Sequence, residues 1–396
     1  MKTNVLQPGS TFVAAGLLAC ALAIPAAGQV REREGPIIDE FLLLNQGNRD
    51  AGLTTNRTIT RDVGDRLFRL RAGQDRWERS TTVPAPAPSA KGGMAKGGMA
   101  KEPIVMTEKS CWEIYGSLFY YTEEYDRQFT IFRPQRPPQS TFVPPPVPII
   151  VRADTEIDVW GGTIGADRRI GENWRLGLAL TGASTDMDLS IFGFPIASTD
   201  VDTLSIMPYV SYYKEDALGS ADFWADFLYG YSDMSYDMQL LGGLTGSPDG
   251  SAHTLNFNTG INFDSSSIVH GPHIGLRYID GEIDNYTLFP VAIGIPGVDY
   301  QSLVSTVGYH VSIPIQLSGG TLVPQFRVGW EHEFEDDVDT LFGLPLAGNE
   351  EDVIVAGAGL GFYCDRSGWN TVLQYEGRFG DDSEGHYVAW KVGKEF

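Results

Sequence analysis

The sequence predicts an all-β fold: a transmembrane barrel of twelve antiparallel strands, preceded by a short N-terminal helix and a disordered linker. From Trp112 to Phe396, apolar and polar residues alternate in segments of about ten, which indicates strands with two different faces. Short turns alternate with mostly longer loops, a pattern typical of outer-membrane barrels. The mean hydropathy of -0.14, with no apolar run of ~18 residues after the first 28, excludes a helical membrane protein.

Residues 1–28 have the features of a cleaved secretory signal peptide. A basic residue precedes an apolar stretch that ends in the small residues Ala26-Ala27-Gly28. A lipoprotein site at Cys20 is the alternative, but a bulky leucine stands where such a site prefers a small residue. In an exported chain Cys111 and Cys364 can form a disulfide, although the sequence does not give their geometry.

The remaining chain divides at about residue 110 into a basic and an acidic part. Residues 29–110 have 14 Lys and Arg against 11 Asp and Glu, a net charge of +3, and residues 111–396 have 14 against 40, a net charge of -26. An acidic chain of this kind is not expected to bind nucleic acid, which requires a basic surface. We therefore expect a domain of residues 111–396 behind a basic N-terminal segment.

The basic segment contains a predicted helix and a linker. Residues 58–71 place Val63, Leu67 and Leu70 on one helical face. Two carboxylates precede arginines by four residues, which favours ion pairs along the helix, and a glycine can end it; these are Asp62 with Arg66, Asp65 with Arg69, and Gly73. Alternating prolines and two Lys-Gly-Gly-Met-Ala repeats over residues 83–101 indicate an unfolded linker.

The twelve predicted strands each have an apolar face for lipid and a polar face for the lumen, because lipid cannot satisfy polar groups. They start near Trp112, Thr155, Trp174, Thr203, Ala221, His253, Gly271, Gln301, Leu322, Val353, Trp369 and His386. The longer loops are expected near residues 122–153, 190–200, 242–252, 289–299, 336–351 and 380–385. Trp112, Trp174 and Trp369 begin strands on the short-turn side, and Trp224 nearly does, which predicts one interfacial aromatic girdle.

Several motifs resemble the translocator domain of autotransporters, the type V secretion barrels of Gram-negative outer membranes. Residues 324–334 contain a Pro, a Trp and a His-Glu-Phe run, similar to the late-strand signature of that family. Residues 112–116 and 160–167 resemble its first two strands. The C-terminal residues Trp390, Val392 and Phe396 resemble the signal that the barrel-assembly machinery recognises, although Lys394 departs from the apolar spacing.

The resemblance implies an outer-membrane location and a helix that runs through the pore. Residues 61–71 resemble that helix. Outer-membrane lipid, lipopolysaccharide and the assembly machinery are the implied partners of a monomeric barrel. Family members usually carry a long surface passenger before the helix, and here we expect a very short or vestigial one, since only residues 29–57 precede it.

Charged residues on the helix and on the lumen face form the candidate site. We expect the helix arginines to pair with lumen carboxylates; the alternative is that they are solvated in the periplasm. The helix arginines are Arg61, Arg66, Arg69 and Arg71, and the lumen residues are Glu331, Glu333, Glu376, Glu395, Arg327 and Arg378.

No catalytic or cofactor site is predicted. His332 lies between Glu331 and Glu333, but alternation turns it toward lipid, while His273 and His310 face the lumen without a serine motif. We find no nucleophile motif, no metal-binding spacing and no cofactor motif, so we expect no enzyme. Carboxylates in the loops around residues 335–352 and 381–384 could hold divalent cations, but we favour a solvated rim.

We therefore interpret the chain as an autotransporter-type barrel with a short or vestigial passenger. The alternative is a porin-like or structural outer-membrane barrel with a periplasmic N-terminal segment and an acidic lumen.

Overall fold

The computed structural model describes residues 36–69, 112–133, 147–265, 268–335, 340–341, 344–345, 352–364 and 367–396. The predicted signal peptide, the linker of residues 72–110, Arg71, Gly73 and Cys111 lie outside the described residues. The described elements are α2 (Pro36–Arg69), β1 (Trp112–Arg133), β2 (Val147–Ile170), β3 (Trp174–Ile191), β4 (Phe194–Lys214), β5 (Ala221–Leu240), β6 (Leu244–Gly246), β7 (Asp249–Ser265), β8 (Ile268–Ile283), β9 (Tyr286–Leu288), β10 (Ile293–Ile295), β11 (Val298–Ser312), β12 (Ile315–Leu317), β13 (Gly320–Glu335), β14 (Thr340–Leu341), β15 (Leu344–Pro345), β16 (Asp352–Tyr363), β17 (Trp369–Phe379) and β18 (Ser383–Glu395).

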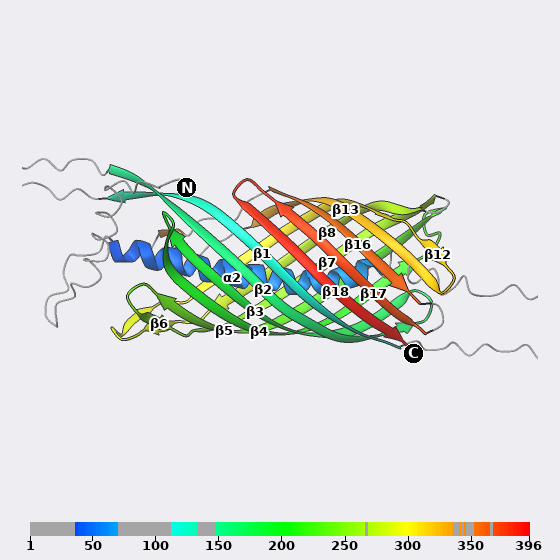
Figure 1. The fold of residues 1–396 in the computed structure, drawn as a ribbon, viewed down its shortest axis with the longest axis horizontal. Helices are drawn as coiled ribbons and strands as arrows, with labels where there is room; N and C mark the ends of the chain where they lie inside the picture. Colours follow the sequence, from blue (N-terminus) through cyan, green and yellow to red (C-terminus); the bar gives the residue numbers. More distant parts are fainter. Residues whose placement is uncertain are drawn as a thin grey trace, which may run out of the picture.

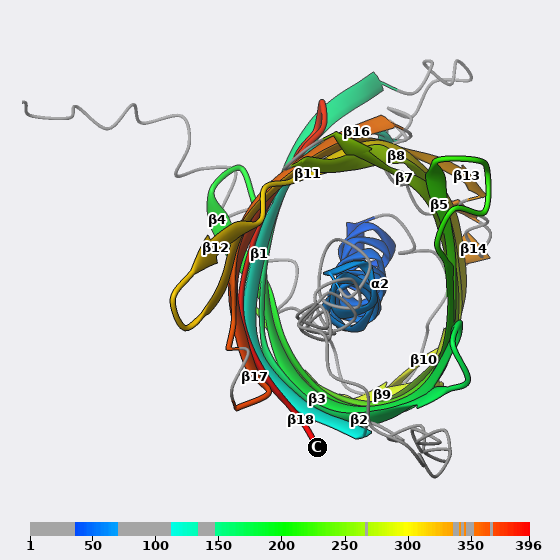
Figure 2. The same ribbon diagram turned by 90° about the vertical axis from the view of Figure 1, so that its right-hand side faces the viewer.

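Twelve of the described strands close into one antiparallel barrel, which confirms the predicted fold class. The barrel order is β1, β2, β3, β4, β5, β7, β8, β11, β13, β16, β17 and β18. The ring closes where β1 pairs with β18, from Glu113 opposite Glu395 to Tyr125 opposite Ser383. Figure 2 shows this ring end on, with α2 inside it. Closure leaves no barrel strand with an unpaired edge, so backbone polar groups are satisfied within the wall.

Several barrel strands are much longer than the predicted ten residues. β1 and β2 have 22 and 24 residues and remain paired up to Arg133 opposite Val147, so most of the predicted loop at residues 122–153 is strand. β3, β4 and β5 likewise have 18 to 21 residues. The predicted loops cover the end of β1 and the starts of β2 and β4, because the pattern of polar and apolar faces changes part of the way along these strands.

The change is an inversion of the two faces, and β5 shows it within one strand. In its first half the outward residues include Phe223 and Phe227, while the buried inward residues include Asp222 and Asp226. In its second half, from Asp233 onward, the outward residues are polar, whereas inward Met234, Tyr236 and Met238 are buried. An apolar exterior fits lipid, and a polar exterior around an apolar interior fits water.

Beyond the apolar belt, the outward face is strongly acidic. Asp158 lies opposite Asp186 on the neighbouring strand, Asp186 opposite Asp200, and Asp200 opposite Asp237. Part of the acidic excess predicted for the barrel therefore lies outside it. The described lumen face carries both charge signs, as where Arg378 lies beside Glu123 and Glu331.

Helix α2 runs along the inside of the barrel (Figure 1). The described helix is not long and apolar enough to cross a membrane by itself. Its side chains from Leu43 to Leu67 are almost all buried. The hydrophobic core of the molecule thus lies inside the barrel, between this helix and the inward-facing apolar side chains of the strands.

The inversion of faces makes a testable prediction about β3. Leu178 lies in the apolar belt and Asp186 lies beyond it on the same face of the strand. Leu178→Lys should lower the free energy of unfolding by about 2–4 kcal/mol in lipid vesicles, because a cation at bilayer depth is poorly solvated. Asp186→Lys is the matched control and should change it by about 1 kcal/mol or less. Equal losses in the two denaturant titrations would contradict the assigned belt.

Candidate functional site: the helix in the lumen

The helix is longer than predicted and has a defined direction. It begins at Pro36 instead of Thr58, and its 34 residues correspond to about 50 Å of helix. Near its start, Asn45 accepts a hydrogen bond of 2.9 Å from Tyr286, which lies in β9 on the long-loop side of the barrel. Near its end, Arg66 lies 3.1 Å from Glu113 at the start of β1, on the short-turn side. The helix therefore runs from the long-loop end to the short-turn end of the barrel (Figure 1).

The first half of the helix was missed because it lacks a single apolar face. Leu44, Arg49, Ala51 and Asn56 are all at most 1% exposed, although they point in different directions around the helix. A helix enclosed on every side has no solvent face, and therefore no amphipathic period that a sequence pattern can reveal. From Leu43 onward, contacts with the enclosing wall stabilise this part of the helix.

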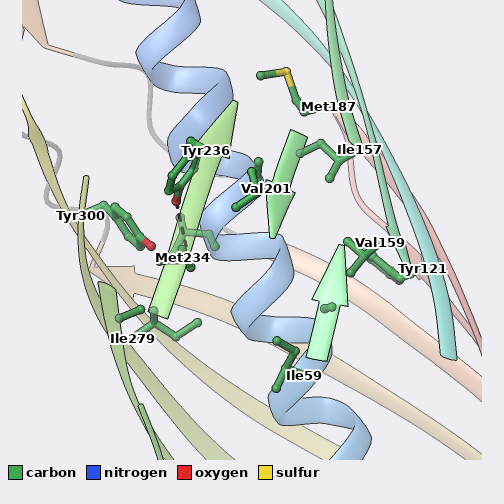
Figure 3. Packing of buried hydrophobic residues seen from close by; sticks show 14 of the residues in the cluster. Ile59, Tyr121, Ile157, Val159, Met187, Val201, Met234, Tyr236, Ile279 and Tyr300 are labelled. Atoms are coloured by element: carbon green, nitrogen blue, oxygen red, sulfur yellow. Dashed lines mark hydrogen bonds between the residues drawn. The ribbon is translucent and has the colours of Figure 1, made fainter. Parts of the chain in front are cut away.

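Apolar side chains surround the first half of the helix. Ile157, Met187, Val201 and Tyr236 point inward from neighbouring strands and are at most 1% exposed. Figure 3 shows them around the helix, with Ile59 further along it. Burial of such side chains stabilises the helix position by about 1.5–3 kcal/mol each before entropy costs are subtracted.

Two helix glycines allow a close approach to this wall. A Cβ atom on Gly52 would lie 2.8 Å from the hydroxyl oxygens of both Tyr236 and Tyr300. A Cβ atom on Gly47 would lie 2.9 Å from the terminal carbon of Met187. Larger residues at these two positions would move the helix away from the wall or displace these side chains.

Neutral hydrogen bonds join the middle of the helix to three strands. Thr199 donates to Asn48 over 2.8 Å, and Ser232 donates to Asn56 over 2.7 Å. The hydroxyls of Thr55 and Thr185 lie 2.7 Å apart. These contacts satisfy polar groups that the surrounding apolar wall would otherwise leave unpaired.

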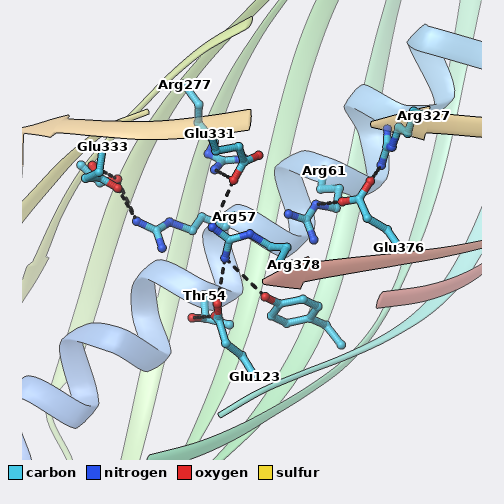
Figure 4. Close-up of polar contacts among 12 residues, drawn as sticks. Thr54, Arg57, Arg61, Glu123, Arg277, Arg327, Glu331, Glu333, Glu376 and Arg378 are labelled. Carbon is cyan, nitrogen blue, oxygen red and sulfur yellow. Dashed lines mark hydrogen bonds and ion pairs between the residues drawn. The ribbon is translucent and has the colours of Figure 1, made fainter. Parts of the chain in front are cut away.

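Ion pairs fix the second half of the helix to the lumen wall (Figure 4). Arg57 lies 2.8 Å from Glu333 and also donates to Ser302 over 3.1 Å. Arg61 lies 3.0 Å from Glu376. These side chains are at most 7% exposed, so removing one partner would leave a buried charge at a cost of about 3–5 kcal/mol.

Arg66 anchors the last turns of the helix near the start of β1. It lies 2.6 Å from Asp167 and 3.1 Å from Glu113, and its guanidinium carbon lies 3.8 Å from the centre of the Tyr115 ring. Arg175 on the wall contacts the same two carboxylates. Two arginines and two carboxylates thus form one cluster, in which each charge has an opposite neighbour.

Asp62 and Asp65 of the helix both pair with the wall. Asp62 lies 2.7 Å from Lys391 and accepts from Ser117 over 2.5 Å and from Tyr387 over 2.9 Å. Asp65 pairs with Arg327 and accepts from Gln374 over 2.5 Å. The wall that surrounds the helix thus offers these carboxylates partners in addition to the arginines four residues further along.

The other predicted lumen residues also lie on the inner face. Arg378 bridges Glu123 at 2.8 Å and Glu331 at 3.1 Å, and Arg327 also pairs with Glu376. Glu395 lies half-buried at the end of β18 and forms no ion pair with the described helix side chains. Arg69 is the last described helix residue, and its side chain, like Arg71, is outside the described part.

Sequence reasoning missed several members of this site, although a signal was present. Arg57 was outside the predicted helix, and Lys391, Glu113, Glu123 and Asp167 were not selected. All four wall residues stand at alternating positions that share the inward face of their strands. Selecting every inward charge, instead of those near one motif, would have found them.

Three of the four tryptophans of the predicted aromatic girdle lie on the outer face of the barrel, and the fourth does not. Trp112, Trp174 and Trp369 are 47–50% exposed on the outer face, whereas Trp224 is fully buried in the lumen. Trp224 shares the inward face of β5 with Asp222, and its ring lies 5.9 Å from that of Phe68. Its closeness to the short turn suggested the girdle, but strand alternation places it inside.

The C-terminal and histidine residues lie as their alternation predicts. Trp390 and Phe396 are exposed on the outer face, and Val392 shares that face half-buried. His332 also faces outward, beside Trp330 and 2.9 Å from Asp352, whereas His310 is buried in the lumen. Among the described residues, no group of three or more His, Cys, Asp or Glu could hold a metal ion.

This geometry defines a β-barrel of the outer-membrane type whose lumen is occupied by its own N-terminal helix. The sequence matches the model of the autotransporter beta-domain over residues 151–376. The chain therefore belongs to the autotransporter β-domain family. Among curated proteins, none matches the sequence.

Two solved structures have a similar fold. One is the translocator domain of the autotransporter NalP from Neisseria meningitidis, with a TM-score of 0.55 and 16% identity, covering 72% of this chain and 88% of that chain. The other is the transport unit of the autotransporter AIDA-I from Escherichia coli, with a TM-score of 0.56 and 11% identity, covering 75% of this chain and 94% of that chain. The match to the family model confirms the family that the sequence motifs predicted, and the two structures confirm the fold.

The glycine contacts predict an asymmetric effect of added methyl groups. Gly52→Ala should lower the free energy of unfolding by about 1–3 kcal/mol, because its methyl group overlaps two tyrosine hydroxyls. Gly64→Ala is the matched control, since its Cβ atom would lie 3.3 Å from the flexible Asn256 amide, and it should be neutral or stabilising. Denaturant titrations check both. Adding Tyr236→Phe and Tyr300→Phe should restore the Gly52→Ala loss, and failure to do so would refute the packing argument.

Proposed function

We propose that the barrel is a translocator through which the segment before α2 passes to the cell surface, after which α2 closes the lumen. The observation that carries the proposal is the direction of the helix. Its first residues lie at the long-loop end, and Arg66 lies beside the first strand at the other end. A chain entering from the short-turn side and stopping at these contacts would leave its N-terminal segment outside.

The proposed location is the outer membrane of a Gram-negative cell, with short turns in the periplasm. The apolar belt, the exposed tryptophans and the family support it. The proposed partners are outer-membrane lipid, lipopolysaccharide and the barrel-assembly machinery, the last through Trp390, Val392 and Phe396. We propose a monomeric barrel, because closure leaves no barrel strand for pairing with a second copy.

We also propose that the protein is not an enzyme. Many of the buried polar groups that surround α2 are engaged with the helix or with each other, as in the Arg378 bridge between Glu123 and Glu331. Their role is to hold a segment in place. A porin-like barrel with a periplasmic N-terminal segment is the second candidate, and it is favoured by the polar cavity of about 100 Å³ that remains beside the helix.

An epitope tag placed after Gln29 distinguishes these two candidates. We expect antibody and protease to reach it in intact cells, because the helix begins at the long-loop end. Tags at Gly242 in a long-loop hairpin and at Leu218 in a short turn are matched controls for the two sides. Protection of the Gln29 tag until the outer membrane is opened would reject the translocator proposal.

Closure of the lumen by the helix is tested by conductance in planar bilayers. Deletion of residues 29–110 should raise single-channel conductance at least tenfold, because it empties the space that α2 fills. A full-length variant with Arg57→Gln, Arg61→Gln and Arg66→Gln should open more often than the wild type, since its anchoring ion pairs are lost. Arg152→Gln, an exposed arginine on the outer wall, is the control. Unchanged conductance of the deletion variant would overturn the plug role.

A further inference from the structure

The helix leaves a cavity of about 100 Å³ on one side of the lumen. The helix contributes Thr60, Arg61 and Gly64 to its lining, and the opposite wall contributes Asn256, Asn258 and Arg277, among other polar residues. A volume of this size holds a few water molecules or one small ion. Because the lining is polar, the cavity suits a polar occupant.

Arg277 is the unusual group in this cavity. Its side chain is 11% exposed, and its Nε and Nη2 atoms are buried without a hydrogen-bond acceptor. The nearest carboxylate in an ion pair, Glu331, lies 3.7 Å away, which is too far for a hydrogen bond, and Arg378 holds it at 3.1 Å. Figure 4 shows Arg277 above Glu331. By contrast, Arg57, Arg61 and Arg66 each have a carboxylate oxygen within 3.0 Å.

The carboxylates that line the cavity are already engaged. Asp65 pairs with Arg327, Glu376 pairs with Arg61 and Arg327, and Asp226 accepts a hydrogen bond from Ser211. Glu331 is held by Arg378. These carboxylates therefore do not accept hydrogen bonds from the Nε and Nη2 atoms of Arg277. A buried donor without an acceptor costs free energy.

We propose that this cavity is a binding site for a small oxyanion of the carboxylate or phosphate type. The adjacent Nε and Nη2 donors of Arg277 form the fork that receives two oxygens of such a group. The amides of Asn256 and Asn258 face the same space and supply further donors. The bound anion contacts both wall and helix, so it adds a bridge between them, whether or not the barrel exports a passenger.

The test is a titration of the full-length folded barrel in detergent, with arginine side chains labelled with ¹⁵N. Sodium acetate and sodium phosphate are the probes, and sodium chloride at equal ionic strength is the reference. We expect one Nε resonance to shift and saturate with acetate or phosphate but not with chloride. That resonance should be absent from Arg277→Lys, which keeps the charge and loses the fork, and no remaining arginine resonance should then shift and saturate with acetate or phosphate.

Two further variants keep the proposal falsifiable if Arg277→Lys does not fold. Asn258→Ala removes one lining donor, leaves Arg277 intact and should weaken acetate binding several-fold. Arg152→Lys changes an exposed arginine outside the lumen and should leave the binding curve unchanged. An acetate or phosphate response that fails to saturate, equals that of chloride or is unaffected by Asn258→Ala would overturn the proposal and leave a cavity that holds only water.

Discussion

The closed ring of strands imposes the constraint on which the rest of this structure depends. Lipid outside the ring accepts no hydrogen bonds, so polar side chains of the membrane-spanning portions must turn inward. The inward face of these strands consequently carries charges such as Glu333, Glu376 and Arg378 in a confined space. Charges in such a space need partners, and the helix supplies many of them. Closure of the barrel thus places charges in the lumen, and the helix that occupies the lumen pairs with them.

The barrel wall changes its polarity along its length, and the helix changes with it. Where the exterior is apolar, the interior is ionic and contacts Arg57, Arg61 and Arg66. Further out, where aspartates cover the exterior, the interior is apolar and contacts Leu44 and Leu53. The outer part therefore has the arrangement of an ordinary water-exposed domain. It holds the helix by burial of apolar surface, while the inner part fixes its rotation and height by specific pairs.

Strand alternation alone predicted the number of barrel strands and the faces of nearly all of them. It placed Trp112 outside and Glu376 inside, because the period of two does not depend on distant contacts. It failed where distant contacts decide the outcome. The predicted loops covered the inverted faces at the end of β1 and at the starts of β2 and β4, and the enclosed helix from Pro36 to Arg57 has no amphipathic face. The partner of each helix charge was also hidden, since Asp62 and Lys391 are 329 positions apart in the chain.

The ion pairs between the helix and the barrel wall have a consequence that apolar contacts alone would not have. A buried ion pair adds little net stability over a well-packed apolar pair, because desolvation offsets much of the attraction. It is, however, specific: one step of the helix along its axis would separate Arg57 from Glu333 and Arg61 from Glu376 at the same time. A segment rich in Arg, Asp and Thr would also be well solvated in a lumen filled with water, before these pairs form. Such a segment can traverse the pore without adhering to the wall and stop in one register, as the proposed translocation requires.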